Sequence, residues 1–169
     1  MRIRDATVDD ADAVALVHVH GWQWGYRGLL PDGYLRGLSP QRRAEQWRSW
    51  LLEPGRTRTH IAEADDGTCV GFAGAGPSRD PGAPDDTGEV YAIYVEERVA
   101  GTGVGTDLLR GAVAWLAGQG FARATLWVLD RNARARRFYE REGWAPDGAT
   151  KSEPREDFMM DEVRYAITM

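Results

Sequence analysis

The spacing of apolar residues changes several times along this chain, and each change marks the start of a predicted strand, helix or loop. Short apolar runs between turn residues predict strands at residues 3–6, 60–64, 68–75, 90–95, 124–129 and 163–168. Apolar residues at helical spacing predict helices after Thr7, after Ser39–Pro40, after the glycines at 101–105 and from Asn132 to Glu142. This order of strands and helices predicts a mixed sheet with helices on both faces.

The weaker parts of the pattern lie near the two ends of the chain. The first helix has Ala13, Leu16, Val17 and His20 at helical spacing, and residues 22–31 fit no regular element. Pro54–Gly55 mark the end of the second helix. A turn at 146–148 and two weak strands around a polar loop complete the prediction.

The glycine-rich stretch after the strand Val90–Val95 is the main signal for chemistry. It reads Gly101-Thr102-Gly103-Val104-Gly105-Thr106 and enters an amphipathic helix. Alternate glycines let backbone N–H groups approach a ligand and point the same way. A helix N-terminus adds about half a positive charge at that place. The stretch therefore predicts a site for an anion, most often a phosphate.

Two familiar phosphate-binding patterns do not match this stretch. A nucleotide P-loop needs Lys and then Ser or Thr after its last glycine, whereas Gly105 is followed by Thr106-Asp107. A dinucleotide fingerprint needs Gly or Ala at its sixth position, which is Thr106 here, and Asp130 comes slightly late for the acidic residue. A third interpretation, an acyl-coenzyme A site, depends on a resemblance to a known family.

Two blocks of sequence resemble the GNAT superfamily of acyl-CoA-dependent N-acetyltransferases. The first is the strand 90–95 with the glycine turn 101–105, which is similar to the family's pyrophosphate loop. The second runs from Leu126–Leu129 through Asn132, Ala135 and Phe138-Tyr139 to Gly143-Trp144. Together the blocks cover about residues 88–145 in the family's order, and the N-terminal helices match the acceptor region by order alone.

The resemblance implies a single domain over residues 1–169 with a layered α/β fold. Its sheet would be mixed and mostly antiparallel, with helices on both faces and splayed central strands. The implied activity is transfer of an acetyl group from acetyl-CoA to a primary amine by direct attack, without a metal. The residues expected to bind acetyl-CoA are Ile93, Tyr94, Val95, Gly101, Thr102, Gly103, Val104, Gly105, Thr106 and Asn132.

One position departs from the family pattern. The family's loop usually starts with Gln or Arg, and the matching residue here is Ala100. A side-chain contact to the pyrophosphate is thereby lost, while the backbone contacts survive. Arg98, Arg131 and Arg134 are candidates to replace it.

Three residues within the stretch covered by these blocks have candidate roles in catalysis or in binding the cofactor. Tyr139 matches the tyrosine that protonates the leaving thiolate in the family, which requires a phenol of pKa about 10 to be held close in a dry site. Glu89 is a candidate base that would draw a proton from the amine through water, or else a solvated acid at a strand end. Asn132 is a helix N-cap, a contact for the pantetheine arm, or both.

The N-terminal region offers an acceptor site. Trp22, Trp24 and Tyr26 are either a wall of the acceptor pocket or ordinary core residues, since aromatic faces accept cations and apolar groups alike. His18 and His20 are alternative bases, although isolated helical histidines more often have a structural role.

Charge and composition limit the classes of molecule that this protein is expected to bind. The net charge of −5 disfavours a nucleic acid and leans towards a cationic amine, as a small molecule or on a peptide. The single cysteine, Cys69, excludes an intrachain disulfide and fits a cytoplasmic protein, and no apolar run is long enough for a membrane span. The histidines and Cys69 show no metal-ligand spacing. The resemblance also allows a homodimer, and the alternative function is a non-catalytic acyl-CoA sensor.

Overall fold

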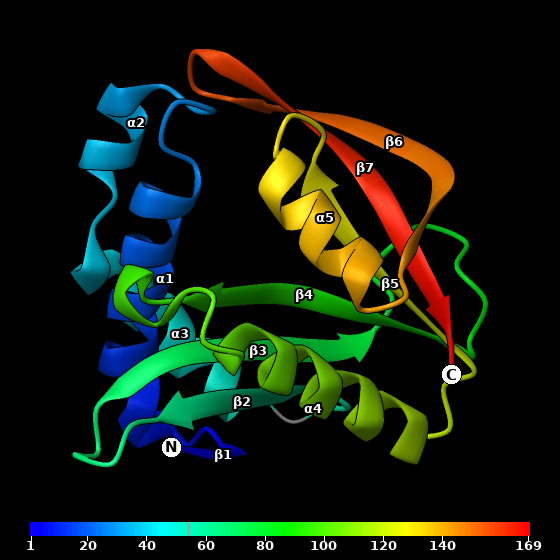
Figure 1. Ribbon diagram of the computed structural model, residues 1–169, viewed down its shortest axis with the longest axis horizontal. Coiled ribbons are helices and arrows are strands. Elements are labelled where there is room, and N and C mark those ends of the chain that lie inside the picture. Colours follow the sequence, from blue (N-terminus) through cyan, green and yellow to red (C-terminus); the bar gives the residue numbers. More distant parts are fainter. Residues whose placement is uncertain (54) are drawn as a thin grey trace.

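The computed structural model, which describes residues 1–53 and 55–169, is organised around one seven-stranded sheet (Figure 1). The strands lie in the order β1-β2-β3-β4-β5-β7-β6. Their bounds are β1 Arg2–Asp5, β2 Arg58–Glu63, β3 Cys69–Pro77, β4 Thr87–Val95, β5 Arg123–Leu129, β6 Ala145–Arg155 and β7 Phe158–Thr168. The neighbours pair antiparallel except β4 and β5, which are parallel. The expected mixed, mostly antiparallel sheet is confirmed.

The α-helices in the described part of the chain number five, and they include helices on both faces of this sheet. They are α1 Ala11–Gly25, α2 Asp32–Gly37, α3 Pro40–Leu52, α4 Val104–Gly118 and α5 Ala133–Arg141. In Figure 1, α4 and α5 lie in front of the sheet and α3 lies behind it. Ser39 caps α3 as expected, because its Oγ accepts a hydrogen bond from the backbone N–H of Arg42. Pro54, expected with Gly55 at the end of this helix, lies outside the described residues.

The first helix is longer and more buried than its pattern predicts. It includes Trp22 and Trp24, and it packs between the sheet and α3. Leu16, expected on its buried side, is 44% exposed, whereas Val14 and Ala15 are fully buried. The prediction failed because a helix buried on two sides has no single apolar stripe.

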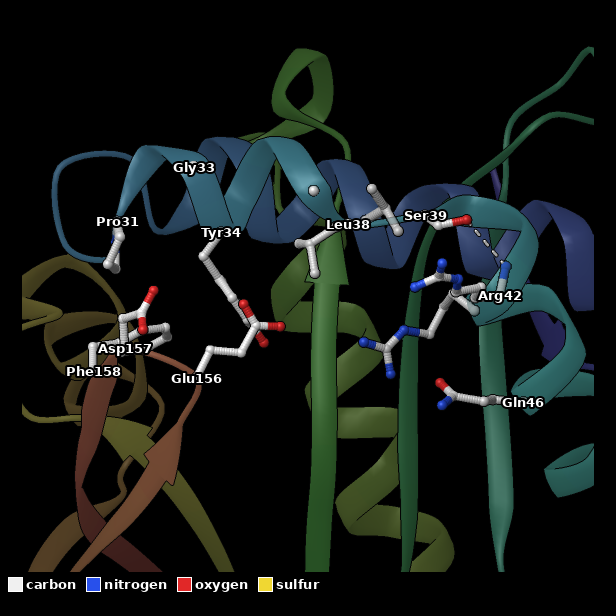
Figure 2. A pocket seen from close by; sticks show the side chains of 13 residues that line it. Pro31, Gly33, Tyr34, Leu38, Ser39, Arg42, Gln46, Glu156, Asp157 and Phe158 are labelled. Carbon is white, nitrogen blue, oxygen red and sulfur yellow. Dashed lines mark hydrogen bonds between the residues drawn. The ribbon is translucent and has the colours of Figure 1, made fainter.

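The short helix α2 is absent from the sequence-based prediction. It has six residues, and its N-cap is Pro31, which makes no side-chain cap hydrogen bond. Tertiary packing holds it, since the Tyr34 ring meets the Phe158 ring edge-on at 4.9 Å. Together with α3 and the turn between β6 and β7, α2 borders a cavity (Figure 2).

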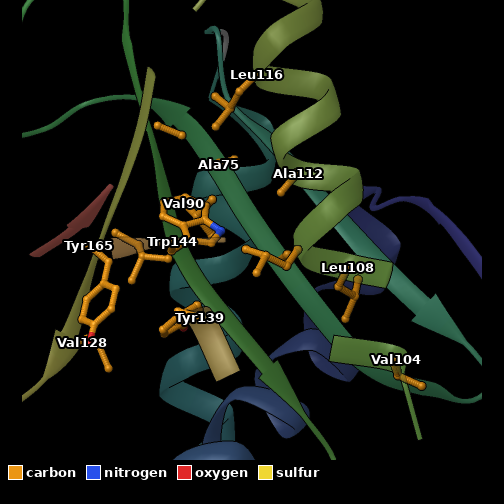
Figure 3. Packing of buried hydrophobic residues seen from close by; sticks show 14 of the residues in the cluster. Ala75, Val90, Val104, Leu108, Ala112, Leu116, Val128, Tyr139, Trp144 and Tyr165 are labelled. Atoms are coloured by element: carbon orange, nitrogen blue, oxygen red, sulfur yellow. The ribbon is translucent and has the colours of Figure 1, made fainter. Parts of the chain in front are cut away.

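The main core lies between the sheet and helices α4 and α5. Figure 3 shows Leu108, Ala112 and Leu116 of α4 directed onto the strands, with Tyr139 and Tyr165 in the same cluster. Burial of this apolar stripe fixes where α4 begins relative to β4, because the chain enters the helix directly from the glycine turn. The core therefore positions the glycine turn at one end of the sheet.

The two central strands separate after a short paired segment. Among the described residues, β4 and β5 pair only at Thr87–Arg123, Gly88–Ala124 and Glu89–Thr125. Beyond that point β4 pairs with β3 alone, and β5 pairs with β7. Tyr91 is an extra residue at a bulge in β4, since Val90 faces Ala75 and Ala92 faces Gly74. The expected splayed central strands are thereby confirmed.

The last two strands form a long hairpin rather than two weak strands. The turn expected at 146–148 is an irregularity within β6, where the register shifts between Pro146 and Thr150. Gly148 has a φ of +91°, a conformation that glycine adopts readily. The prediction was wrong because a bulge and a turn use the same residue types.

Candidate active site

A cleft of about 440 Å³ opens where β4 and β5 separate. Its walls come from both strands, from the starts of α4 and α5, and from the end of α1. It brings together Trp24, Tyr26, Ile93, Tyr94, Val95, Gly101, Gly103, Gly105, Thr106, Asn132 and Tyr139. Segments distant in the sequence thus meet at the candidate site expected from the sequence.

The glycine turn at one end of the cleft has an unusual backbone. Gly101 and Gly103 have φ values of +79° and +99°, which L side chains rarely adopt. A methyl group placed on either glycine would meet no atom within 4 Å, so the space in front of them is open. Gly103 is the N-cap of α4 and makes no side-chain cap hydrogen bond. The first N–H groups of α4 therefore point to an open site suited to an anion.

Two of the expected acetyl-CoA-binding residues direct their side chains elsewhere. The hydroxyl of Thr102 donates a hydrogen bond to the carbonyl oxygen of Val99 at 2.8 Å. Val104 is buried in the main core. At both positions the backbone N–H groups remain as the groups able to meet a ligand.

Arginine side chains of α5 supply positive charge at the cleft. Arg134 lines it, and its guanidinium stacks on the Trp24 ring at 4.1 Å. The Trp24 indole in turn donates to the carbonyl oxygen of Val95 at 2.9 Å. Arg141, which the sequence analysis missed, lines the cleft as well. Arg141 follows Arg134 by seven residues, and residues at this spacing lie on the same face of a helix. The sequence could therefore have indicated that both arginines face the cleft.

Tyr139 is a buried tyrosine whose ring lies on the wall of the cleft. It is 8% exposed, and burial raises the pKa of its hydroxyl well above the ordinary value of 10.0, with a smaller contribution from Tyr26. The hydroxyls of Tyr26 and Tyr94 lie 3.0 Å apart, and burial likewise raises the pKa of Tyr26 to about 12. These phenols are therefore protonated at neutral pH and can donate hydrogen bonds or protons.

Asn132 begins α5 at the rim of the same cleft. Its side-chain oxygen accepts a hydrogen bond from the backbone N–H of Ala135 at 3.1 Å, so it is the N-cap of α5. It is also buried and lines the cleft. Its amide NH₂ is thus positioned by the cap at the cleft wall.

Glu89 lies apart from the other candidates, at the paired end of β4. It is 3% exposed, and its carboxylate accepts hydrogen bonds from the backbone N–H of Arg79 at 2.8 Å and from the Arg79 guanidinium at 2.9 Å. The same guanidinium lies 3.9 Å from the centre of the Tyr91 ring. The buried carboxylate of Glu89 thus pairs with a largely exposed guanidinium, and this ion pair anchors the loop after β3.

The aromatic residues of α1 divide between the cleft and the interior. Trp24 and Tyr26 line the cleft, whereas the Trp22 ring packs edge-on against Tyr26 at 5.0 Å, behind the wall. His18 is buried beside Tyr94, with ring centres 5.1 Å apart, and its Nδ1 accepts a hydrogen bond from the Trp47 indole at 3.2 Å. His20 contacts the carboxylate of Glu96 at 3.0 Å.

Replacing His18 with glutamine is expected to remove an acid-sensitive contribution to stability. Burial, with a smaller effect of Arg43, lowers the pKa of His18 from 6.5 to about 3. The unfolded chain therefore binds a proton at His18 below about pH 6.5 that the folded protein does not bind, so stability is lost as the pH falls. At pH 5 the loss from this group is about 2 kcal/mol relative to pH 8.

Chemical denaturation at both pH values measures this difference. The wild-type protein should lose about 2 kcal/mol more than His18→Gln between pH 8 and pH 5. Glutamine keeps an acceptor for the Trp47 indole, so the comparison isolates the titration. An equal loss in both proteins would contradict the neutral state of His18.

Two further features bear on the class of protein. Within the described ranges, no group of three or more His, Cys, Asp or Glu side chains is arranged to hold a metal ion. The helices that the structure describes include none with the length and apolar character needed to span a membrane.

Comparison with known proteins identifies similar sequences and folds. Residues 19–144 match the acetyltransferase (GNAT) family. The chain is 34% identical over 152 residues to a probable N-acetyltransferase of Mycobacterium tuberculosis, and the aligned region covers 89% of this chain and 83% of that protein. It is 32% identical over 130 residues to an uncharacterized N-acetyltransferase of Bacillus subtilis, and this aligned region covers 77% of this chain and 72% of the relative.

Solved structures share the fold at low sequence identity. PaiA N-acetyltransferase from Thermoplasma acidophilum, solved in complex with coenzyme A, superposes with a TM-score of 0.72 at 19% identity and covers 99% of this chain and 98% of that one. A GCN5-related N-acetyltransferase from Rhodopseudomonas palustris superposes with a TM-score of 0.78 at 16% identity, covering 99% and 95%. These likenesses extend over the whole sheet and its helices.

Proposed function

Because this chain belongs to the GNAT acetyltransferase family, we propose that it transfers an acetyl group from acetyl-CoA to a primary amine. The observation that carries the proposal is the cleft between β4 and β5, which joins an open glycine turn at one end to Tyr139 on its wall. An elongated molecule that carries a phosphate group and an acyl thioester could bind its phosphate at the glycine turn and place its thioester beside Tyr139.

The strand edge and the glycine turn would hold acetyl-CoA. Residues 90–95 pair with β3 on one side, so their other edge is available to an extended chain with amide groups. The pantetheine arm would pair there with Ile93, Tyr94 and Val95, and Asn132 would contact it from α5. The backbone N–H groups from Gly101 to Thr106 would bind the pyrophosphate.

Replacing Arg134 with alanine is expected to weaken acetyl-CoA binding about tenfold at low salt, because we assign it the phosphate contact that Ala100 lacks. Arg134 lies at the cleft with its guanidinium ordered by Trp24. Calorimetry with acetyl-CoA measures the change, and Arg137→Ala, an exposed residue of the same helix, is the control. Ala100→Arg should restore the affinity of the Arg134→Ala variant. Equal affinities in all four proteins would contradict the assignment.

Bound acetyl-CoA would supply a thioester that an amine attacks directly, with coenzyme A as the leaving group. The proposed part of Tyr139 is to donate its phenolic proton to the sulfur as the carbon–sulfur bond breaks, while the attacking nitrogen loses its proton to water and a proton returns from water to the phenolate. Burial keeps that phenol protonated and excludes competing water. Glu89 is held by Arg79, and we assign it the anchoring of the loop rather than a contact with the amine.

Release of free thiol from acetyl-CoA, followed with a panel of primary amines, tests the proposal. Thiol release that depends on the amine supports acetyl transfer. Calorimetric binding of acetyl-CoA without thiol release for any amine would instead support a non-catalytic acyl-CoA sensor. That alternative is favoured by Ala100, since a sensor tolerates weaker phosphate binding.

A further inference from the structure

Two tyrosine hydroxyls form a hydrogen-bonded pair in the cleft between β4 and β5. Tyr26 follows the last turn of α1, Tyr94 belongs to β4, and both line the cleft. Their hydroxyl oxygens lie 3.0 Å apart. The function proposed above uses the backbone of Tyr94 and gives neither hydroxyl a part.

This pair has hydrogen-bonding capacity that the protein leaves unused. A phenolic hydroxyl carries one hydrogen and can also accept hydrogen bonds. The bond between Tyr26 and Tyr94 uses one of the two hydrogens, and neither oxygen has a second partner in the part of the chain that the structure describes. The Nε1 of Trp22, in the same group of rings, is buried and also has no partner there. Because polar groups removed from water normally form hydrogen bonds, these unused positions suit a polar ligand in the cleft.

Ring packing fixes the direction of both hydroxyls. The Tyr94 ring stacks on His18, with ring centres 5.1 Å apart and planes inclined by 19°. The Tyr26 ring meets the Trp22 ring edge-on at 5.0 Å. A methyl group placed on Gly21 would lie 2.8 Å from Cβ of Tyr94, so α1 approaches β4 this closely because residue 21 is glycine. The hydroxyl pair is therefore oriented before a ligand binds, which lowers the entropy cost of binding.

Tyr94 and Tyr139 reach the cleft from opposite faces of the sheet. Tyr94 packs against the cluster that joins the sheet to α1 and α3, whereas Tyr139 belongs to the cluster beneath α4 (Figure 3). Both side chains line one cleft because it opens where β4 and β5 separate. Tyr26 is close enough to Tyr139 to contribute to the raised pKa of the Tyr139 hydroxyl. A thioester between the strands would thus have Tyr139 on one side and the hydroxyl pair on the other.

From this arrangement we infer that the hydroxyls of Tyr26 and Tyr94 bind the nitrogen of the acceptor amine and orient it for attack on the thioester. The inference rests on the proposed acetyl transfer and specifies how the acceptor is held. A neutral primary amine has two N–H groups and one lone pair, so an N–H donated to a phenol oxygen leaves the lone pair free for the carbonyl carbon. Both phenols keep their own hydrogens, since burial raises the pKa of each.

The hydrogen bond from the amine to the pair would strengthen during the reaction. The nitrogen gains positive charge as the carbon–nitrogen bond forms, and hydrogen bonds from a charged donor are about twice as strong as neutral ones. An interaction that is stronger in the transition state than in the ground state raises the rate. The surplus proton of the nitrogen then passes to water, and the pair is left unchanged. A primary amine has one hydrogen for the pair and another to lose, whereas a secondary amine has a single hydrogen for both, so the pair favours primary amines.

Matched amines and variants without the hydroxyls test the inference. Thiol release from saturating acetyl-CoA is measured with a panel of alkylamines, arylalkylamines and amino acids and with the N-methyl derivative of each. Tyr26→Phe and Tyr94→Phe should each lower kcat/KM for the best primary amine about tenfold, the factor for one hydrogen bond to a group that becomes charged. The preference of the wild-type protein for primary over N-methyl amines should shrink in both variants. The double variant should lose less than the product of the two single losses, because both substitutions disrupt the same pair.

Tyr34→Phe is the matched control. The Tyr34 ring belongs to the same group of rings, with its centre 6.3 Å from that of Trp22, but it lines the cavity beside α2 rather than the cleft (Figure 2). This variant should keep the wild-type kcat/KM and the preference for primary amines. Calorimetric affinity for acetyl-CoA should stay unchanged in every variant, which shows that each is folded.

The outcomes separate this inference from the proposed function. Full kcat/KM in both Tyr26→Phe and Tyr94→Phe, or an equal loss in Tyr34→Phe, would overturn the inference while acetyl transfer stands. An absence of thiol release with every amine in the wild-type protein would overturn the proposed function itself.

Discussion

Replacing Gly103 with glutamate is expected to abolish acetyl-CoA binding. Gly103 has a φ of +99° and caps α4, so any L side chain is strained there by about 1–2 kcal/mol. A carboxylate at this place would also stand where the pyrophosphate is proposed to bind, and like charges in a binding site cost several kcal/mol. The affinity measured by calorimetry should therefore fall at least about 100-fold.

Two further variants separate charge from strain. Gly103→Ala introduces the strain alone, into a space with no atom within 4 Å, and should retain most of the affinity that Gly103→Glu loses. Gly111→Glu places the same charge on the same helix, eight residues further on, where the glycine has an ordinary helical backbone and open space. It should bind acetyl-CoA like the wild-type protein. Full affinity in Gly103→Glu would contradict the proposed phosphate site.

Replacing Tyr139 with phenylalanine is expected to lower turnover about 10²–10⁴-fold, the range typical of a lost general acid. The substitution keeps the ring in the core and removes only the hydroxyl at the cleft wall. Acetyl-CoA affinity should therefore change little. Because burial raises the pKa of Tyr139, its phenol should stay protonated from pH 7 to pH 9. Wild-type turnover should therefore not fall over this range through ionisation of Tyr139.

Tyr165→Phe is the matched control for this experiment. Tyr165 is fully buried in the same cluster, and its hydroxyl donates to Glu140 at 2.7 Å and accepts from Arg136 at 3.1 Å. Its replacement should lower the free energy of unfolding by about 1–3 kcal/mol and leave turnover unchanged. Normal turnover in Tyr139→Phe would remove Tyr139 from the mechanism.

Local signals in the sequence were sufficient for the centre of the fold. The order of strand, glycine turn and helix around residues 90–118 depends on neighbouring residues, because glycine conformations and helix caps act over a few positions. The cap at Asn132 was predictable for the same reason, and its hydrogen bond to Ala135 is present. These two segments place most of the cleft.

Features set by distant contacts were not predictable. The buried side of α1 depends on α3 packing against it, and α2 depends on rings such as Phe158 from the other end of the chain. The Arg79–Glu89 ion pair joins the loop after β3 to β4. The net charge of −5 favoured a cationic acceptor. Arg43 lines a cavity whose walls come from distant segments of the folded chain, so the sequence alone did not predict that cavity.

The three residue pairs between β4 and β5 make the middle of the sheet its weakest seam. On one side stand β1–β4 with α1, α3 and α4, and on the other stand β5–β7 with α5. Side chains also join the halves, since Glu142 accepts from Thr106 and Arg110, and Arg164 pairs with Asp80. Beyond Glu89 the two halves are held together by side chains and not by backbone hydrogen bonds between β4 and β5. A ligand that pairs with β4 while touching α5 would add a further connection between the halves, so its binding should raise the free energy of unfolding of the whole domain.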